Sequence, residues 1–263
     1  MKFGMPTLVE CKDIIETASV AACFDLDFIE VNMSFPQYLP SRSNAEQYRS
    51  IAKKHGIFYT VHADEQLNPF DFNPTVSECY FRTMAECIDY SLEIGVPIIN
   101  MHLQKGVYVT LPEKVVLLTD VYKDEYLSRV KDFIKMCEDR IAGRELKICI
   151  ENVDSNAFTF SQYDALGLFL KSEVFGFTLD VGHDECLGGI DGLYIRKFPE
   201  KLCHMHLHDS DGKHAHLPLG EGVINVGEKL TLLNNDTTCL VEVKTVAGLE
   251  KSVNFLKRNN YMR

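Results

Sequence analysis

"LKICIEN", residues 146–152, is a short apolar run that ends on a carboxylate and an amide. Cys149 stands between two isoleucines, so apolar side chains point to both faces of the expected strand. Strands that are apolar on both faces are typical of a parallel sheet covered by helices. Runs of this kind recur seven more times, at residues 2–5, 27–33, 57–63, 97–103, 176–181, 202–208 and 238–244.

Between these runs lie longer segments with apolar residues at three- and four-residue spacing, which predicts amphipathic helices. Eight strands alternating with helices predict an α/β fold, a (β/α)8 TIM barrel, with residues 1–263 as a single domain. An open doubly wound sheet is the alternative, but it needs a glycine-rich turn after the first strand, and "GMPTLVECKD" (residues 4–13) offers none. The connection at residues 104–125 is predicted to be a loop or lid over the top face.

The composition of the chain argues against a nucleic-acid-binding, secreted or membrane protein. The chain has 263 residues, a length at which α/β barrels form one unit. Its 38 Asp and Glu against 27 Lys and Arg give a net charge of −11, which repels a polyanion because no basic run offsets it. Nine cysteines without a CxxC motif indicate reduced thiols, and neither an export signal nor a membrane span is indicated. We therefore expect a cytoplasmic protein with no membrane partner.

Polar residues recur where the expected strands end. In a barrel, these carboxyl ends meet at one mouth, where active sites of this architecture lie. Burying several carboxylates there without a partner is costly, so they need a compensating positive charge, which a divalent metal ion supplies. The residues at these ends are His62, His102, Glu151, Asp180, His183, His206, His208 and Glu242.

Five of the nine histidines lie in "CHMHLHDSDGKHAHLPLGEG", residues 203–222. His204, His206 and His208 share one side of the expected strand, because side chains alternate between faces. We expect that side to point into the barrel, with His204 in the core and His206 at the lip. His214 and His216 follow in a loop that could fold back over the mouth.

Other polar residues near the mouth have two interpretations each. Asp64, Asp209 and Asp211 either orient the imidazoles or form loops. Lys244 lies two residues beyond Glu242 and shares its face, so it is either a substrate contact or half of a structural ion pair.

Six motifs together resemble the xylose isomerase-like TIM barrels, a superfamily that includes endonuclease IV (the class II AP endonucleases) and many sugar isomerases and epimerases. The motifs are "VHAD", "NMHLQKG", "IENVD", "LDVGHDE", "HMHLHDSDGKHAHLPLGEGVIN" and "LVEVK". They span nearly the whole chain. They are specific for the superfamily and much less specific for the reaction.

Resemblance to the sugar isomerase and epimerase branch implies one bound divalent ion: manganese or zinc first, then cobalt or magnesium. It would be held by Glu151, Asp180, His206 and Glu242. The same resemblance implies that Glu151 and Glu242 flank the substrate carbon as the catalytic pair. His183, His208 and Lys244 are the expected substrate contacts.

Resemblance to endonuclease IV implies up to three zinc ions. His62 and His102 would bind one of them together with Glu151, which bridges to a second ion held by Asp180, His206 and Glu242. His183, His214 and His216 would surround the third. Endonuclease IV has an aspartate where His214 stands, so the third site here would be all imidazole and would neutralise less of the ion's charge.

The sequence favours a divalent-metal-dependent isomerase or epimerase of a small sugar, polyol or sugar phosphate, working through an enediolate. Zinc-dependent cleavage at abasic sites is the alternative, but the mouth loops "SFPQYLPSRSN" and "ADEQLNPFDFNP" contain one basic residue, Arg42, so we do not expect a nucleic-acid partner. A non-catalytic metal- or sugar-binding barrel and a lyase are further alternatives. A homodimer is expected by analogy with related epimerases.

Overall fold

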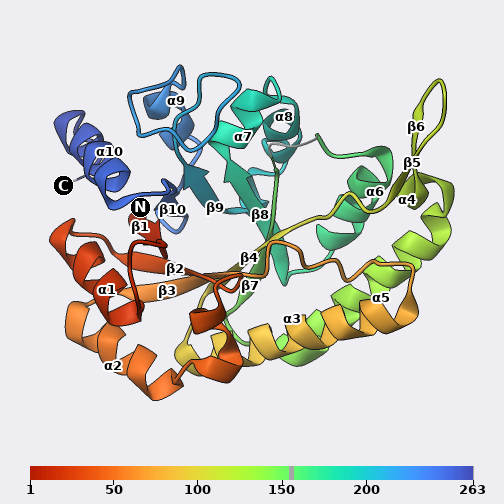
Figure 1. Cartoon of the computed structure of the whole chain (residues 1–263), viewed down its shortest axis with the longest axis horizontal. Coiled ribbons are helices and arrows are strands. Elements are labelled where there is room, and N and C mark those ends of the chain that lie inside the picture. The colour runs from red at the N-terminus through yellow and green to blue at the C-terminus, as the bar shows by residue number, and fades with distance from the viewer. Residues whose placement is uncertain (154–156, 263) are drawn as a thin grey trace.

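Eight parallel strands close into a barrel in the computed structural model, which describes residues 1–153 and 157–262 (Figure 1). Their order around the barrel is β1-β10-β9-β8-β7-β4-β3-β2. This confirms the predicted single-domain (β/α)8 TIM barrel. The strands are Lys2–Pro6 (β1), Phe28–Asn32 (β2), Phe58–His62 (β3), Ile98–His102 (β4), Lys147–Glu151 (β7), Phe175–Asp180 (β8), Leu202–Leu207 (β9) and Thr238–Val241 (β10).

Helices cover the outside of the barrel, and local sequence signals fix their ends. The long helix α3 (Pro74–Ile94) begins after Asn73, whose side chain accepts from the backbone N–H of Thr75, and ends at Gly95 in the left-handed conformation. The remaining helices are α1 (Ile14–Cys23), α2 (Ala45–His55), α4 (Leu118–Val121), α5 (Lys123–Ile141), α6 (Phe160–Phe169), α7 (Val181–Cys186), α8 (Ile190–Ile195), α9 (Val226–Leu230) and α10 (Val246–Arg258).

The connection at residues 104–125 differs from the predicted loop or lid over the top face. It contains a two-stranded hairpin, β5 (Tyr108–Thr110) and β6 (Val115–Leu117), which projects at the upper right of Figure 1. The two strands form a sheet of their own, separate from the barrel, and α4 then leads into α5. The hairpin therefore stands beside the barrel. Residues 104 and 105, at its base, are the part of this segment that lines the central pocket.

Large and small side chains alternate inside the barrel below the mouth. The Phe28 ring lies against Gly4, where a Cβ atom would sit 2.5 Å from the ring carbons. The same ring stacks on Phe58, with ring centroids 5.1 Å apart. This apolar layer closes the barrel beneath the polar residues that follow on the same faces of the strands. No helix among the described residues is long and apolar enough to span a bilayer.

Replacing Gly4 with alanine should destabilise the fold, because the added methyl group cannot fit beside Phe28 without moving its ring. We expect a loss of about 1–3 kcal/mol in the free energy of unfolding, measured by urea denaturation. Gly167→Ala in α6 is the matched control: nothing lies within 4 Å of its added Cβ, and we expect a gain of about 0.5–1 kcal/mol. Equal effects at both positions would contradict this packing argument.

Candidate metal centre

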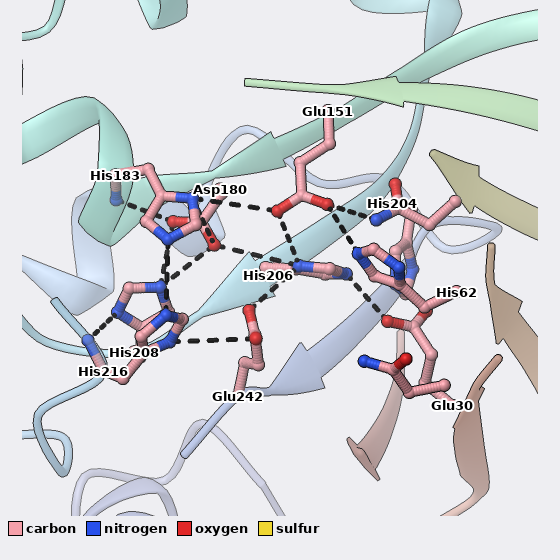
Figure 2. A network of polar contacts seen from close by, with 12 residues as sticks. Glu30, His62, Glu151, Asp180, His183, His204, His206, His208, His216 and Glu242 are labelled. Carbon is pink, nitrogen blue, oxygen red and sulfur yellow. Dashed lines mark hydrogen bonds and ion pairs between the residues drawn. The ribbon is translucent and has the colours of Figure 1, made fainter. Parts of the chain in front are cut away.

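Four residues from neighbouring strands meet at the carboxyl end of the barrel (Figure 2). Glu151 ends β7, Asp180 ends β8, His206 lies near the end of β9, and Glu242 directly follows β10. The strand register places Asp180 beside His206. One ligand atom from each of the four lies within 4.8 Å of the others. The structure thus brings together the whole set that the sequence predicted for one cation.

Three of these four residues are carboxylates: Glu151 and Asp180 are buried, and Glu242 is partly buried. The Nδ1 atom of His206 faces them, at 3.1 Å from Glu151 Oε1, 3.0 Å from Glu242 Oε2 and 3.8 Å from Asp180 Oδ2. Among the described residues, neither ring nitrogen of His206 nor Glu242 Oε2 has a hydrogen-bond partner of good geometry. Buried polar atoms are normally satisfied, so this group fits a bound cation. Three carboxylate oxygens and one imidazole nitrogen suit manganese or zinc.

The pKa shifts in this group reflect the same concentration of charge. Burial disfavours the protonated ring of His206, but the carboxylates of Glu151 and Glu30 outweigh burial and raise its pKa well above the usual range. Burial likewise disfavours the ionised form of Glu151 and Glu242, yet His206 holds both of their pKa values well below normal. All these groups are therefore charged near neutral pH, and the three carboxylates exceed the positive charge of one imidazolium.

A second group shares Glu151. His62 Nε2 and His102 Nε2 each lie 3.3 Å from Glu151 Oε2, while Glu151 Oε1 faces His206. The side-chain amide of Asn100 also donates to Glu151 Oε2. The two oxygens of one carboxylate therefore serve two sets of ligands, which is the arrangement of a bridging carboxylate.

The predicted third set, His183, His214 and His216, does not form. His183 and His216 are close, with their Nε2 atoms 3.3 Å apart. His214, however, is largely exposed, and its Nδ1 lies 2.8 Å from Asp211 Oδ2. Asp211 also accepts from the backbone N–H of His214, so this local turn holds the ring outside the pocket.

His208 lies next to His183 and His216, but it is fully buried and was predicted to contact substrate. Its Nδ1 accepts from the backbone N–H of His216 at 2.8 Å, and its Nε2 lies 2.9 Å from Asp180 Oδ1. Gly182 permits this packing, because a Cβ atom there would lie 2.0 Å from the His208 ring. Both ring nitrogens are used, so His208 orients Asp180 and the loop that follows β9. It does not line the pocket.

Of the three aspartates with two interpretations, Asp211 both forms a turn and holds the His214 ring, while Asp64 and Asp209 are loop formers. Asp209 accepts from the backbone N–H groups of Ser210, Gly220 and Ile224, which shapes the loop after β9. Asp64 accepts from the backbone N–H of residue 66.

A pocket of about 320 Å³ opens above the four-residue group. Its volume is at the lower end of the range for small-molecule sites. His183 and Lys244 line it as predicted for substrate contacts, and Lys244 Nζ lies 2.7 Å from Glu242 Oε1. Sequence reasoning missed several other lining residues: Glu30, Asn32, Glu65, Gln104, Phe158 and Gln162. Of these, only Glu30 could have been identified from the sequence as a candidate site residue, because it is a charged residue in the middle of an apolar strand.

Comparisons with known proteins agree with this architecture. A family model described as xylose isomerase-like TIM barrel matches residues 18–259. A search of curated proteins finds no significant match.

Among solved structures, a D-tagatose 3-epimerase-like protein is similar over 99% of this chain and 97% of its own, with a TM-score of 0.76 and 24% identity. The 3-keto-D-glucoside 4-epimerase from E. coli matches over 100% of both chains, with a TM-score of 0.78 and 14% identity. Endonuclease IV from Thermus thermophilus covers 98% of this chain and 100% of its own, with a TM-score of 0.67 and 18% identity. Identities this low show a shared fold.

In metal-free protein, the pair of His62 and Glu151 should make stability depend on pH. Burial opposes the charged ring, but the contact with Glu151 raises the pKa of His62 from 6.5 to about 9. The stabilisation is fully present below pH 6.5 and is lost as the pH rises to about 9. We expect the free energy of unfolding of chelator-treated protein to fall across this window. Urea denaturation at several pH values measures it, and His62→Gln should reduce the fall. An identical pH dependence in the variant would refute this assignment.

Proposed function

The chain belongs to the xylose isomerase-like TIM barrel family, and on that premise we propose that it is a divalent-metal-dependent isomerase or epimerase of a small sugar, polyol or sugar phosphate. The observation that carries the proposal is the placement of Glu151 and Glu242. Both line the pocket, and both approach His206 Nδ1, at 3.1 and 3.0 Å. Two carboxylates around one cation site supply the acid and base that proton transfer at a carbon requires.

When bound, a divalent cation would polarise the substrate carbonyl and the neighbouring hydroxyl, which lowers the cost of the enediolate. Glu151 and Glu242 do the proton transfer. One carboxylate takes the proton from the carbon next to the carbonyl, and the electron pair of the broken C–H bond moves toward the carbonyl oxygen. Return of a proton from the other glutamate, on the opposite face, inverts that carbon. Return to the neighbouring carbon, together with transfer of the hydroxyl proton to the former carbonyl oxygen, gives the isomer instead.

The pocket suits a small polyhydroxylated molecule. Among the described residues, its lining mixes hydrogen-bonding groups with the phenyl ring of Phe158. His183 and Lys244 are the proposed contacts for substrate hydroxyl groups. Two of the similar structures are described as epimerases of sugars or sugar derivatives, which agrees with a carbohydrate substrate. Manganese or zinc is the proposed metal, with cobalt or magnesium as alternatives.

A second candidate, zinc-dependent hydrolysis of a phosphodiester at an abasic site, is favoured by one observation. His62 and His102 converge on the far oxygen of Glu151, so the site offers ligands for a second ion beside the first. Paired metal ions suit in-line displacement at phosphorus. The mouth argues against a DNA substrate, because Glu65 lines the pocket where a phosphate backbone would approach.

Replacing either catalytic glutamate with glutamine should abolish proton transfer, because the amide has no basic oxygen. We expect E151Q and E242Q each to lower turnover about 10²–10⁴-fold. Incubation with a panel of ketohexoses and aldoses in D2O, followed by mass spectrometry, measures deuterium incorporation at the substrate carbon. Full exchange activity in both variants would contradict this mechanism. Glu113→Gln, at the exposed tip of the hairpin, is the control and should retain wild-type turnover.

Metal content separates the two candidate functions. We expect protein purified without added metal to contain one manganese or zinc ion per chain by elemental analysis, and to leave an oligonucleotide with an abasic site intact. Removal of the ion with a chelator should abolish exchange of substrate protons, since the carbonyl is no longer polarised. Three zinc ions per chain, together with chelator-sensitive incision of the oligonucleotide, would establish the phosphodiesterase instead.

A further inference from the structure

Glu30 is a buried carboxylate behind the candidate metal centre. It lies in the middle of β2 and is 2% exposed, and β3 and β4 separate β2 from β7, the strand of Glu151 (Figure 2). Its Oε1 lies 3.0 Å from Nε2 of His206. No part of the proposed proton transfer uses it, although burying an ionised carboxylate at this depth is costly unless it is held and paired.

The other oxygen of Glu30 is firmly held. Oε2 accepts from Thr60 Oγ1 at 2.9 Å and lies 3.1 Å from His204 Nε2. On the far side of the His204 ring, Nδ1 lies 2.5 Å from Thr238 Oγ1. The threonine hydroxyl can donate to Nδ1, which places the ring proton on Nε2, facing Glu30. Residues from β2, β3, β9 and β10 therefore fix the direction of one carboxylate.

The two nitrogens of His206 face different partners. Nδ1 points at the group of Glu151, Asp180 and Glu242, and Nε2 points at Glu30. A nitrogen that binds a cation must offer its lone pair, so the single proton of the neutral ring has to sit on Nε2. Glu30 Oε1 faces that nitrogen at ion-pair distance, 3.0 Å, and a small rotation of either side chain is needed for Nε2–H to donate to it with good geometry.

We propose that Glu30 is a positioning residue that holds His206 with Nδ1 free for the cation. This inference rests on the cation site of the proposed function. Carboxylates that accept the second N–H of a metal-binding histidine fix its tautomer and ring orientation and make it a stronger ligand, and their loss typically costs 10–100-fold in metal affinity.

Glu30, His204 and His206 could also be considered as a metal site of their own, since their ligand atoms lie within 4.8 Å of one another. The hydrogen bonds argue against this. Glu30 Oε2 already has two partners, and the second nitrogen of His204 is engaged by Thr238. This group therefore supports the cation site above it and does not bind an ion itself.

Titration of chelator-treated full-length protein with Zn²⁺ and with Mn²⁺, followed by calorimetry, tests the proposal. We expect Glu30→Gln to weaken binding of the tightest ion about 10–100-fold, because the neutral amide is a poorer acceptor for the proton of His206. Asp191→Asn is the matched control. It also removes a buried carboxylate, but one whose hydrogen-bond partners, Phe158 N and Tyr163, include neither Glu30 nor a proposed metal ligand, so its metal affinity should match the wild type.

The thermal unfolding temperature of each metal-free variant shows whether a loss of metal affinity comes from a less stable fold or from the lost contact with His206. The proposal requires that E30Q lose affinity while D191N, whatever its stability, does not. If E30Q does not fold, Thr60→Val removes one hydrogen bond that holds Glu30 and should weaken binding about two- to tenfold. Wild-type protein that binds neither ion would overturn the proposed function itself. Wild-type binding with unchanged affinity in the Glu30 and Thr60 variants would overturn this inference alone.

Discussion

Repulsion among three closely placed carboxylates, two buried and one partly buried, is the constraint on which the upper half of the barrel depends. Glu151, Asp180 and Glu242 approach one point from adjacent strands, where the low dielectric strengthens their repulsion. Two positive partners can relieve it: an imidazolium from the same strands, or a divalent cation. His206 allows either partner, because its ring lies among the carboxylates. The ring is the positive partner when it is protonated, and it becomes a ligand when it loses a proton and a metal ion binds.

The unusual number of histidines follows from this constraint. His62 and His102 face the outer oxygen of Glu151, His208 fixes Asp180, and His204 fixes Glu30. Each carboxylate around the centre therefore has at least one imidazole within ion-pair distance. Histidine suits this task because it can donate a proton when the site is empty and bind a metal ion when it is neutral.

Much of the fold and of the candidate site could be predicted from the sequence, because both depend on local periodicity. Apolar runs indicated the strands, and residues at their carboxyl ends necessarily meet in a closed parallel barrel. The loop after β9 could not be predicted in the same way. Whether His208 or His214 joins the centre depends on backbone hydrogen bonds to Asp209 and Asp211 and on the positive φ of His216, which no spacing rule reveals. Glu30 was missed because no motif near it in the sequence indicates its role. The residues that it contacts lie on strands far along the chain.

The ligand set by itself does not choose between proton transfer and phosphodiester hydrolysis, because metal ions and carboxylates serve both reactions. What separates them is the space above the centre. A DNA substrate needs a broad basic surface, whereas this mouth is a pocket of about 320 Å³ whose lining includes Glu65 and the side-chain amides of Asn32, Gln66, Gln104 and Gln162. Lys244 is paired with Glu242 at 2.7 Å, so its charge is directed into the site. Size and charge at the mouth, more than the metal ligands, therefore favour a small polyhydroxylated substrate.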